Sequence, residues 1–212
     1  MSERQILIFG ASGHAKVVLD IVEREGRGKL ALLVDDDPAR AGQKLLGYAV
    51  AGGRDALLKH GAKAGLVIVA IGANPARRSV AAWLAAQGFA FASAVHPGAQ
   101  IGREVRIGAG TVVMAGTAIN PDTEIGMHCI VNTGASVDHD CRLGEGVHVA
   151  PGARLCGGVS VGAGAFIGAG AVVVPGRQIG ADAIIAAGAV VLKDVPERAV
   201  VAGNPARPLN EP

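Results

Sequence analysis

Residues 159–173 read Val-Ser-Val-Gly-Ala-Gly-Ala-Phe-Ile-Gly-Ala-Gly-Ala-Val-Val, and in this stretch an aliphatic side chain returns at every sixth position. Two positions earlier the residues are mostly small, and glycine follows the aliphatic residue at 102, 108, 126, 144, 162, 168 and 180. A period of six fits neither an α-helix nor the alternation of an ordinary strand. The register runs without insertion through sixteen positions, all aliphatic: Ile101, Ile107, Val113, Ile119, Ile125, Val131, Val137, Leu143, Val149, Leu155, Val161, Ile167, Val173, Ile179, Ile185 and Val191.

Each six-residue unit is interpreted as a short strand followed by a corner. The aliphatic residue points inward and stacks on its equivalents in the neighbouring coils, while the small residue packs inside the bend. Glycine is expected to lower the steric cost at the corner. Three units close one triangular coil, and about five such coils stack as a solenoid. The repeat therefore predicts a left-handed parallel β-helix from about residue 95 to residue 191.

The first third of the chain lacks the repeat. Apolar runs predict buried strands at 5–9, 30–34, 66–71 and 89–92 and a short strand at 48–51, and helical spacing predicts helices at 15–25, 55–60 and 77–87. This alternation predicts a small parallel, Rossmann-like sheet. A boundary is expected near residues 93–98, so the predicted domains are 1–94 and 95–212, the second ending in a capping loop at 201–207.

A glycine turn, Gly10-Ala11-Ser12-Gly13-His14, joins the first predicted strand to the first predicted helix. Such turns aim backbone N–H groups at phosphate. The turn departs from G-x-G-x-x-G because Ser12 holds the middle position. The acidic cluster at 35–37 follows the second strand, where a carboxylate can bind a ribose or a base edge. These features favour a nucleotide site, and a strand-to-helix turn without a ligand remains the alternative.

Composition narrows the classes of partner. With 20 basic and 18 acidic residues, the net charge of +2 gives no electrostatic footprint for nucleic acid. The longest apolar runs, such as residues 65–73, are far shorter than the roughly 20 residues that span a bilayer, and no signal-peptide pattern is seen. The three cysteines, at 129, 141 and 156, lack metal-ligand spacing and are interpreted as buried thiols of a reducing compartment. We expect a cytoplasmic protein without nucleic-acid partners or membrane insertion.

Polar residues stand out within the aliphatic solenoid. Asn120 and Asn132 replace the corner glycine, and His139 lies between two carboxylates, Asp138 and Asp140. Flanking carboxylates fix the tautomer of a histidine and raise its basicity, which suits proton removal from a nucleophile. Attack on a thioester also needs N–H donors for the oxyanion, which a glycine such as Gly157 can supply. Because adjacent strand residues point to opposite faces, Asp140 orients His139 only if the pair lies at a corner.

Several motifs together resemble one branch of the hexapeptide acyltransferases. That branch, the bacterial sugar O/N-acyltransferases, contains enzymes acting on bacillosamine and perosamine precursors and the sialic acid O-acetyltransferases. The resemblance covers almost the whole chain. It is carried by Ile-Phe-Gly-Ala-Ser-Gly-His-Ala-Lys at 8–16, Asp-Asp at 35–36, Ile-Gly-Ala-Asn at 71–74, Val-Asn-Thr-Gly at 131–134, Val-Asp-His-Asp-Cys at 137–141 and Gly-Asn-Pro-Ala at 203–206.

The resemblance implies a homotrimer that binds acetyl-CoA in a groove between neighbouring β-helices and uses no metal. It implies that His139 is the general base, Asp140 its orienting acid and Gly157 the oxyanion donor. Several members of the branch have Glu where Asp140 stands. The resemblance also implies that the cofactor is bound by His148, which lies beside the thioester, and by Gly157, Asn204 and Pro205. It places Asn132 in the acceptor site. The residues that it implies around the nucleotide are Gly10, Ser12, Gly13, His14, Asp35, Asp36 and Asn74.

The expected reaction is acetyl-CoA-dependent N-acetylation of a UDP- or GDP-linked 4-amino-dideoxy sugar, by direct attack of the amine on the thioester. The first alternative is O-acetylation of a sugar such as sialic acid. The second is a zinc hydratase built on His128, His139 and His148, whose spacings of 11 and 9 residues contain no close pair. The third is a non-catalytic scaffold with a nucleotide-sensing domain, which would not bind coenzyme A.

Overall fold

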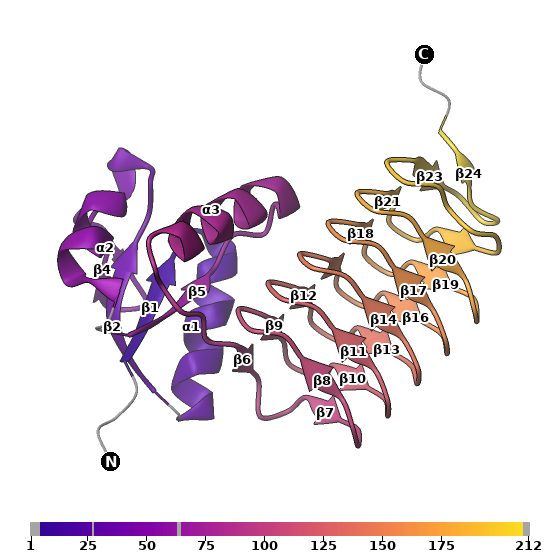
Figure 1. The fold of residues 1–212 in the computed structure, drawn as a ribbon, viewed down its shortest axis with the longest axis horizontal. Helices are drawn as coiled ribbons and strands as arrows, with labels where there is room; N and C mark the ends of the chain where they lie inside the picture. Colours follow the sequence, from indigo (N-terminus) through magenta and orange to yellow (C-terminus); the bar gives the residue numbers. More distant parts are fainter. Residues whose placement is uncertain (1–4, 27, 63–64, 210–212) are drawn as a thin grey trace. The chain divides into compact units, whose positions relative to one another are not determined.

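The computed structural model describes residues 5–26, 28–62 and 65–209, and the chain forms two compact units, Met1–Pro97 and Gly98–Pro212 (Figure 1). The units divide inside the segment 93–98, where His-Pro interrupts the apolar pattern of the sequence. Each unit is described by itself below. Among the residues described, no helix is both long enough and apolar enough to cross a membrane.

The first unit contains a parallel sheet of β1 (Gln5–Phe9), β2 (Lys29–Val34) and β5 (Leu66–Val69), in the order β2-β1-β5 (Figure 1). The predicted small parallel sheet is therefore confirmed. The other elements are α1 (Gly13–Glu25), the 3-10 turn η1 (Pro38–Arg40), β3 (Lys44–Leu45), β4 (Tyr48–Ala49), α2 (Arg54–His60), α3 (Asn74–Ala86) and β6 (Ala94–Val95).

Two of the expected strands differ from the structure. The expected strand at 89–92 is reduced to one parallel bridge between Val67 and Phe91. Its two hydrogen bonds to β5 both involve Val67, and the N–H of Phe89 donates instead to the carbonyl of Leu84 in α3. The short strand expected at 48–51 forms as β4, which pairs antiparallel with the unpredicted β3. Helix α3 begins at Asn74, ahead of the predicted start, because Pro75 suits the first turn of a helix.

Helices α1 and α3 are amphipathic and bury their apolar stripes. Helix α1 buries Val18, Leu19, Ile21 and Val22 at helical spacing, and it ends where Gly26 adopts the left-handed conformation. A second apolar cluster joins the strands to α2 and α3: Leu7, Phe9, Val34, Leu57, Val67, Val69, Val80, Ala81, Leu84 and Phe89. This packing fixes the loops at the carboxyl ends of the strands, where ligands bind in open parallel sheets.

The second unit is the predicted left-handed parallel β-helix, whose coils lie one on the next in Figure 1. From the first coil to β19, each strand pairs in parallel with the strand 18 residues further on, as Val137 does with Leu155. At the end of the solenoid β21 pairs with β23 at a spacing of 16 residues. The three faces are β7-β10-β13-β16-β19-β22, β8-β11-β14-β17-β20 and β9-β12-β15-β18-β21-β23. The strands are β7 (Gln100–Ile101), β8 (Arg106–Ile107), β9 (Val112–Val113), β10 (Ala118–Ile119), β11 (Glu124–Ile125), β12 (Ile130–Val131), β13 (Ser136–Val137), β14 (Arg142–Leu143), β15 (His148–Val149), β16 (Arg154–Leu155), β17 (Ser160–Val161), β18 (Phe166–Ile167), β19 (Val172–Val173), β20 (Gln178–Ile179), β21 (Ile184–Ile185), β22 (Val190–Val191) and β23 (Val200–Ala202).

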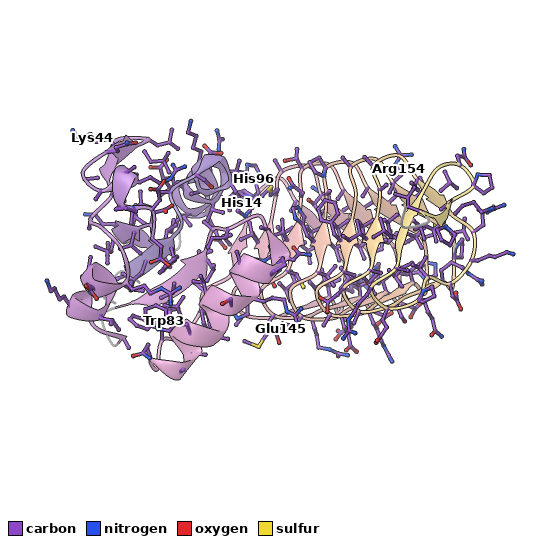
Figure 2. All side chains as sticks on the ribbon, turned by 90° about the horizontal axis from the view of Figure 1, so that it is seen from above. His14, Lys44, Trp83, His96, Glu145 and Arg154 are labelled. Atoms are coloured by element: carbon purple, nitrogen blue, oxygen red, sulfur yellow. The ribbon has the colours of Figure 1, made fainter. Side chains whose placement is uncertain are left out.

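The solenoid core is built from the aliphatic and small columns of the repeat. Val137, Leu155 and Val173 are each at most 1% exposed, whereas Ile101 in the first coil is 40% exposed. Threonines at small positions stay buried because each hydroxyl donates to a carbonyl of the same or the next coil, as Thr111 does to Gly126 at 2.8 Å. Charged side chains such as Glu145 and Arg154 lie on the outside (Figure 2).

The capping loop ends the solenoid as a short hairpin. Strand β24 (Arg207–Pro208) pairs antiparallel with β23, and the turn between them contains a cis peptide bond at Asn204–Pro205. Both ends of this turn hydrogen-bond to Val190 of the last regular coil. Its N–H donates to the carbonyl of Gly203 at 3.0 Å, and its carbonyl accepts from the N–H of Ala206 at 2.8 Å.

The glycines after the aliphatic residues are needed for stacking rather than for corner conformation. At Gly162 an added Cβ would lie 2.4 Å from the backbone nitrogen of Ala181 in the next coil, and its φ is not left-handed. The left-handed position comes two residues later, where Gly164 has φ 72° and Gly170 has φ 67°. The sequence interpretation of these glycines is corrected accordingly.

Two alanine substitutions separate these roles. Gly162→Ala is expected to lower the free energy of unfolding by about 3 kcal/mol, because its Cβ meets backbone that cannot rotate away. Gly170→Ala is expected to cost about 1 kcal/mol, since its Cβ meets nothing within 4 Å and only the left-handed φ is penalised. Urea unfolding at one protein concentration measures both. Equal losses would contradict the stacking role.

Candidate active site and nucleotide-binding cavity

His139 and Asp140 form the turn between β13 and β14, at a corner of the solenoid. Asp140 has φ 59°, a left-handed conformation that Asp tolerates better than most residues. At this corner the two side chains meet, with 2.7 Å between Nδ1 of His139 and Oδ2 of Asp140. Asp140 can orient His139 only if the pair lies at a corner of the solenoid, and the structure places the pair at a corner.

The charges around the ring of His139 favour its protonated form. The hydrogen bond to Asp140 is the largest cause that raises the pKa of His139, and the charge of Asp138 raises it further. In the neutral ring, Nδ1–H donates to Asp140, so Nε2 is left to accept a proton. Both side chains are well exposed, at 61% for His139 and 66% for Asp140. This pair is equipped to take a proton from an incoming nucleophile.

Gly157 lies one coil beyond His139 and directly against its ring. A Cβ at Gly157 would lie 2.6 Å from both Cε1 and Nε2 of His139. The neighbouring Gly158 donates its N–H to the carbonyl of His139 at 2.9 Å. Within the described part of the chain, the N–H of Gly157 makes no hydrogen bond. A free backbone donor thus stands beside the ring nitrogen of the candidate base.

Asn132 and His148 form a second polar cluster. The side-chain nitrogen of Asn132 is 3.1 Å from Nε2 of His148, whose ring meets the ring of Phe166 edge-on at 5.2 Å. His148 is only 9% exposed. Asn132 lies at the corner before β13 and His139 at the corner after it. Four extended residues separate these corners, roughly 13 Å. Within one chain, the structure does not bring His148 and Asn132 next to His139.

The remaining expected cofactor residues lie at the end of the solenoid. Asn204 and Pro205 are exposed in the turn between β23 and β24. This turn bonds to Val190 of β22, which lies three coils beyond β13 on the same face. Coils stack at the spacing of hydrogen-bonded strands, so roughly 14 Å of solenoid separates this turn from the coil of His139. A ligand contacting both ends must be long.

A cavity of about 530 Å³ opens at the carboxyl ends of β1 and β2 in the first unit. Its volume falls within the range of small-molecule sites. Four of the expected nucleotide residues line it: Gly10, Ser12, Asp35 and Asp36. The rest of its lining is Phe9, Asp37, Arg40, Arg54, Ile71, Ala76, Ser79 and Val80.

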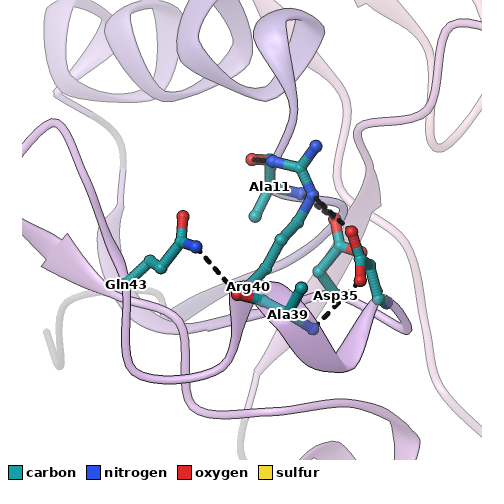
Figure 3. Close-up of polar contacts among 6 residues, drawn as sticks. Ala11, Asp35, Ala39, Arg40 and Gln43 are labelled. Atoms are coloured by element: carbon teal, nitrogen blue, oxygen red, sulfur yellow. Dashed lines mark hydrogen bonds and ion pairs between the residues drawn. The ribbon is translucent and has the colours of Figure 1, made fainter.

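The carboxylate of Asp35 bonds to the glycine turn and is not free in the cavity. Its Oδ2 accepts from the N–H of Ala11 at 2.6 Å, and Arg40 donates to the carbonyl of Ala11 at 2.7 Å. Arg40 also lies 3.8 Å from the Asp35 carboxylate, so the two side chains bracket Ala11 (Figure 3). Gly10 is required here because it has φ 110° and an added Cβ would lie 2.7 Å from the carbonyl oxygen of Ala70.

Asp36 is paired rather than free. It lies 2.9 Å from Nε of Arg54, whose guanidinium stacks 4.4 Å above the ring of Trp83. Sequence reasoning identified neither Arg40 nor Arg54, because they stand in no motif and reach the cavity only through folding. The two arginines supply the positive charge that balances the acidic cluster.

His14 and Asn74 are held beneath the turns, and Gly13 is exposed at the start of α1; none of the three lines the cavity. Burial, together with the charge of Arg77, lowers the pKa of His14 to about 4, so this ring is neutral at physiological pH. Arg77 is 1% exposed and donates to Oδ1 of Asn74 at 2.7 Å. It also donates to the carbonyls of Ile71 and Gly72, and so fixes the loop after β5. Sequence reasoning missed Arg77 as well.

No group of three or more His, Cys, Asp or Glu side chains is arranged to hold a metal ion among the residues described. His128, His139 and His148 belong to different corners and strands of the solenoid. Cys129 and Cys141 are buried as expected, and burial raises the pKa of Cys141 to about 11. Cys156 is only half-buried, because it leads into the turn at Gly157.

Two family models match the chain. The PglD N-terminal domain matches residues 5–84, and the bacterial transferase hexapeptide (six repeats) matches residues 158–193. No curated protein sequence matches the chain significantly.

Solved structures match both units together. A variant of perosamine N-acetyltransferase from Caulobacter crescentus, in complex with CoA and GDP-perosamine, is 44% identical over 98% of this chain and 97% of that one, with a TM-score of 0.92. The acetyltransferase domain of PglB from Neisseria gonorrhoeae, in complex with acetyl coenzyme A, is 36% identical over 98% and 100%, with a TM-score of 0.91. WeeI from Acinetobacter baumannii is 31% identical over 97% and 100%, with a TM-score of 0.89. The resemblance seen in the sequence is thus confirmed, and the chain belongs to the family of hexapeptide-repeat sugar acetyltransferases that carry a PglD-type N-terminal domain.

Proposed function

We propose that the protein transfers an acetyl group from acetyl-CoA to the amino group of a UDP- or GDP-linked 4-amino-dideoxy sugar. The observation that carries the proposal is the corner at which His139, Asp140 and the free N–H of Gly157 meet. Related structures that hold CoA with GDP-perosamine, or acetyl-CoA, support the two substrates. A mass-spectrometric screen of amino-sugar nucleotides with acetyl-CoA tests it. Acetylation of a hydroxyl sugar but of no amino sugar would refute it in favour of O-acetylation.

In the proposed reaction the sugar amine attacks the carbonyl carbon of the thioester. Nε2 of His139 takes a proton from the amine, and the Gly157 N–H donates to the developing oxyanion. The tetrahedral intermediate collapses as the carbon–sulfur bond breaks, and the proton on His139 passes to the leaving thiolate of coenzyme A. Asp140 holds the ring and stabilises the imidazolium. No metal and no covalent enzyme intermediate take part.

We also propose that the working enzyme is a homotrimer with acetyl-CoA between neighbouring β-helices. The separation of Asn132 and His148 from His139 along one face supports a site completed by a second copy. In this arrangement His148 and Gly157 lie near the thioester, Asn132 lines the acceptor site, and Asn204 and Pro205 contact the far end of the cofactor. Light scattering measures the assembly, and a mixture of His139→Ala and His148→Ala subunits should recover activity that neither homotrimer has.

The proposed division of labour follows the expected domains. Residues 1–94 hold the nucleotide, and residues 95–212 carry out acetyl transfer. Beside the cavity, the backbone N–H groups of Ser12 and Gly13 at the start of α1 suit the phosphates, and Asp36 suits the ribose or base. Gly10 allows the close turn, and its own N–H donates to the carbonyl of Val34 at 2.7 Å. Asp35, His14 and Asn74 shape the surrounding turns. A cytoplasmic location is proposed because the three cysteines, of which two are buried, form no disulfide.

Asp35→Ala tests the nucleotide cavity. The change removes the acceptor for the Ala11 N–H and one of the two carboxylates beside Arg40, so the glycine turn is held only through the Arg40 bond to the Ala11 carbonyl. We expect the Kd for the nucleotide sugar to rise about tenfold, the loss of roughly one charge-assisted hydrogen bond. The KM for acetyl-CoA should stay unchanged. Calorimetric titration with UDP-, GDP- and CMP-sugars measures the effect and identifies the base. An unchanged Kd for every nucleotide would contradict a site in this cavity.

A further inference from the structure

Asp138 begins the corner that carries His139, and its N–H, its carbonyl and its Oδ1 are all hydrogen-bonded. Its N–H donates to the carbonyl of Leu155 at 2.9 Å, and its carbonyl accepts from Oγ1 of Thr123 at 2.9 Å. Its Oδ1 accepts from Nδ2 of Asn120 at 2.8 Å and from the backbone N–H of His139 at 2.9 Å. One carboxylate oxygen therefore joins the coil below to the backbone of the candidate base.

The Asn120–Asp138 pair interrupts an otherwise uncharged column of the solenoid. The equivalent positions in the coils before and after are Gly102, Cys156 and Val174. Polar side chains enter this column only beneath the turn of His139. The hydrogen bond from Asn120, followed by that from the His139 N–H, lowers the pKa of Asp138, so its carboxylate is charged at neutral pH.

We infer that Asp138, held by Asn120, is a positioning residue that fixes the backbone of His139 so that the ring stays over Gly157 with Nε2 open. The inference rests on the proposed base role of His139. Asp140 restrains the ring at one nitrogen only, and the turn itself is exposed to solvent. The neighbouring coils also hold this turn, at the carbonyl of His139 through the Gly158 N–H at 2.9 Å and at the Asp140 N–H through the carbonyl of Pro121 at 3.2 Å. The bond to Asp138 is the one that holds the N–H of His139 itself. Its loss would let the ring shift, and a misplacement of about 1 Å costs on the order of 10²-fold in rate.

The carboxylate of Asp138 also acts through its charge. Asp138 and Asp140 flank His139 on its own turn. The equivalent corner holds Asn120 and Asp122 in the coil below, and Cys156 and Gly157 in the coil above. After Asp140, the charge of Asp138 is the next cause that raises the pKa of His139. A general base must be unprotonated, so the rate rises as pH rises through this pKa. Removing the charge should move that rise to lower pH.

Asp138→Asn and Asp138→Ala separate the two effects. Asn keeps the shape and an acceptor oxygen but loses the charge, so the rise in kcat should move to lower pH while the KM for acetyl-CoA is unchanged. Ala loses the bond as well, and kcat should fall about tenfold or more. Asp194→Asn is the matched control, because Oδ1 of Asp194 likewise accepts a backbone N–H, that of Gln178 at 3.0 Å, in a later coil. It should change neither quantity.

Asn120→Ala shows whether Asn120 acts through Asp138. Alone it should lower kcat, and added to Asp138→Ala it should have no further effect, because its partner is already gone.

An NMR titration of the His139 ring, assigned with His139→Ala, gives a readout that needs no catalysis: its pKa should fall in Asp138→Asn and not in Asp194→Asn. If the wild-type enzyme acetylates no amino sugar, the proposed function fails while this titration still tests the effect of the Asp138 charge on His139. The positioning role is overturned if Asp138→Ala keeps the wild-type kcat, or loses activity only in step with the loss of folded protein. The effect of the charge is overturned if Asp138→Asn leaves both the titration and the pH profile unchanged.

Discussion

His139→Ala is expected to lower kcat by about 10²- to 10⁴-fold, the usual contribution of a general base. The variant should fold normally, since the ring is 61% exposed and bonds only to Asp140 and the Gly157 surface. The KM for both substrates should change little, because the ring acts on the proton of the amine rather than on binding. Steady-state kinetics with a thiol-detecting assay measure the change.

His60→Ala serves as the control for this variant. His60 ends α2 in the first unit and takes no part in the proposed chemistry. A loss of much less than tenfold in His139→Ala would show that the amine needs no base from the protein. In wild-type enzyme, kcat should rise with pH through a pKa above the ordinary value of a histidine, because Asp140 and Asp138 favour the charged ring. A rise at or below the ordinary value would contradict this electrostatic environment.

Gly157→Ala is expected to lower kcat by about 10²-fold without unfolding the protein. The new Cβ would lie 2.6 Å from Cε1 and Nε2 of His139, so the ring has to swing out of place. The φ of Gly157 is not left-handed, so alanine suits the backbone there. The methyl group also stands beside the Gly157 N–H, and a lost oxyanion donor is worth about 10²- to 10³-fold. The measurement is kcat beside the thermal midpoint of unfolding.

Gly176→Ala is the matched control, one coil beyond Gly158 at the same corner. It has φ 70° and nothing within 4 Å of an added Cβ, so it should cost stability of about 1 kcal/mol and leave kcat unchanged. Combining Gly157→Ala with His139→Ala tests the cause. If the methyl group acts by displacing the ring, most of its effect should vanish once the ring is absent. Full additivity of the two losses would point to the oxyanion donor alone.

The sequence predicted the left-handed β-helix and its register because its information is local and repeated. It predicted about five coils, whereas the structure has about six, and the end of the chain contributes β23 to one face. Each six-residue unit makes the same contacts as the units 18 residues away, so one register of aliphatic residues specifies every strand. Because the repeat consists mostly of aliphatic and small residues, His139 and its flanking carboxylates could be recognised in it as polar exceptions. In the first unit, patterning predicted β1, β2, β5 and the helices. It failed at residues 89–92, where an apolar run that is only partly buried forms a single bridge to Val67.

The residues that the sequence missed act through contacts between distant segments. Arg40 reaches the glycine turn across 29 residues, and Arg54 reaches Asp36 and Trp83. Arg77 is buried, and the helical pattern of the sequence does not predict that burial. Arginine is common on exposed helical surfaces. The sequence therefore does not predict which backbone carbonyl an arginine side chain will donate to.

The sequence alone thus determined the β-helix, the parallel sheet before it and the identity of the candidate base, because these follow from periodicity and residue chemistry. The tertiary structure decided which of those residues stand together. It places Asp140 on Nδ1 of His139 and Gly157 against the ring, and it separates Asn132 and His148 to another corner. The reason is physical: a left-handed turn and the stacking of coils 18 residues apart set side-chain directions, and linear spacing does not record them.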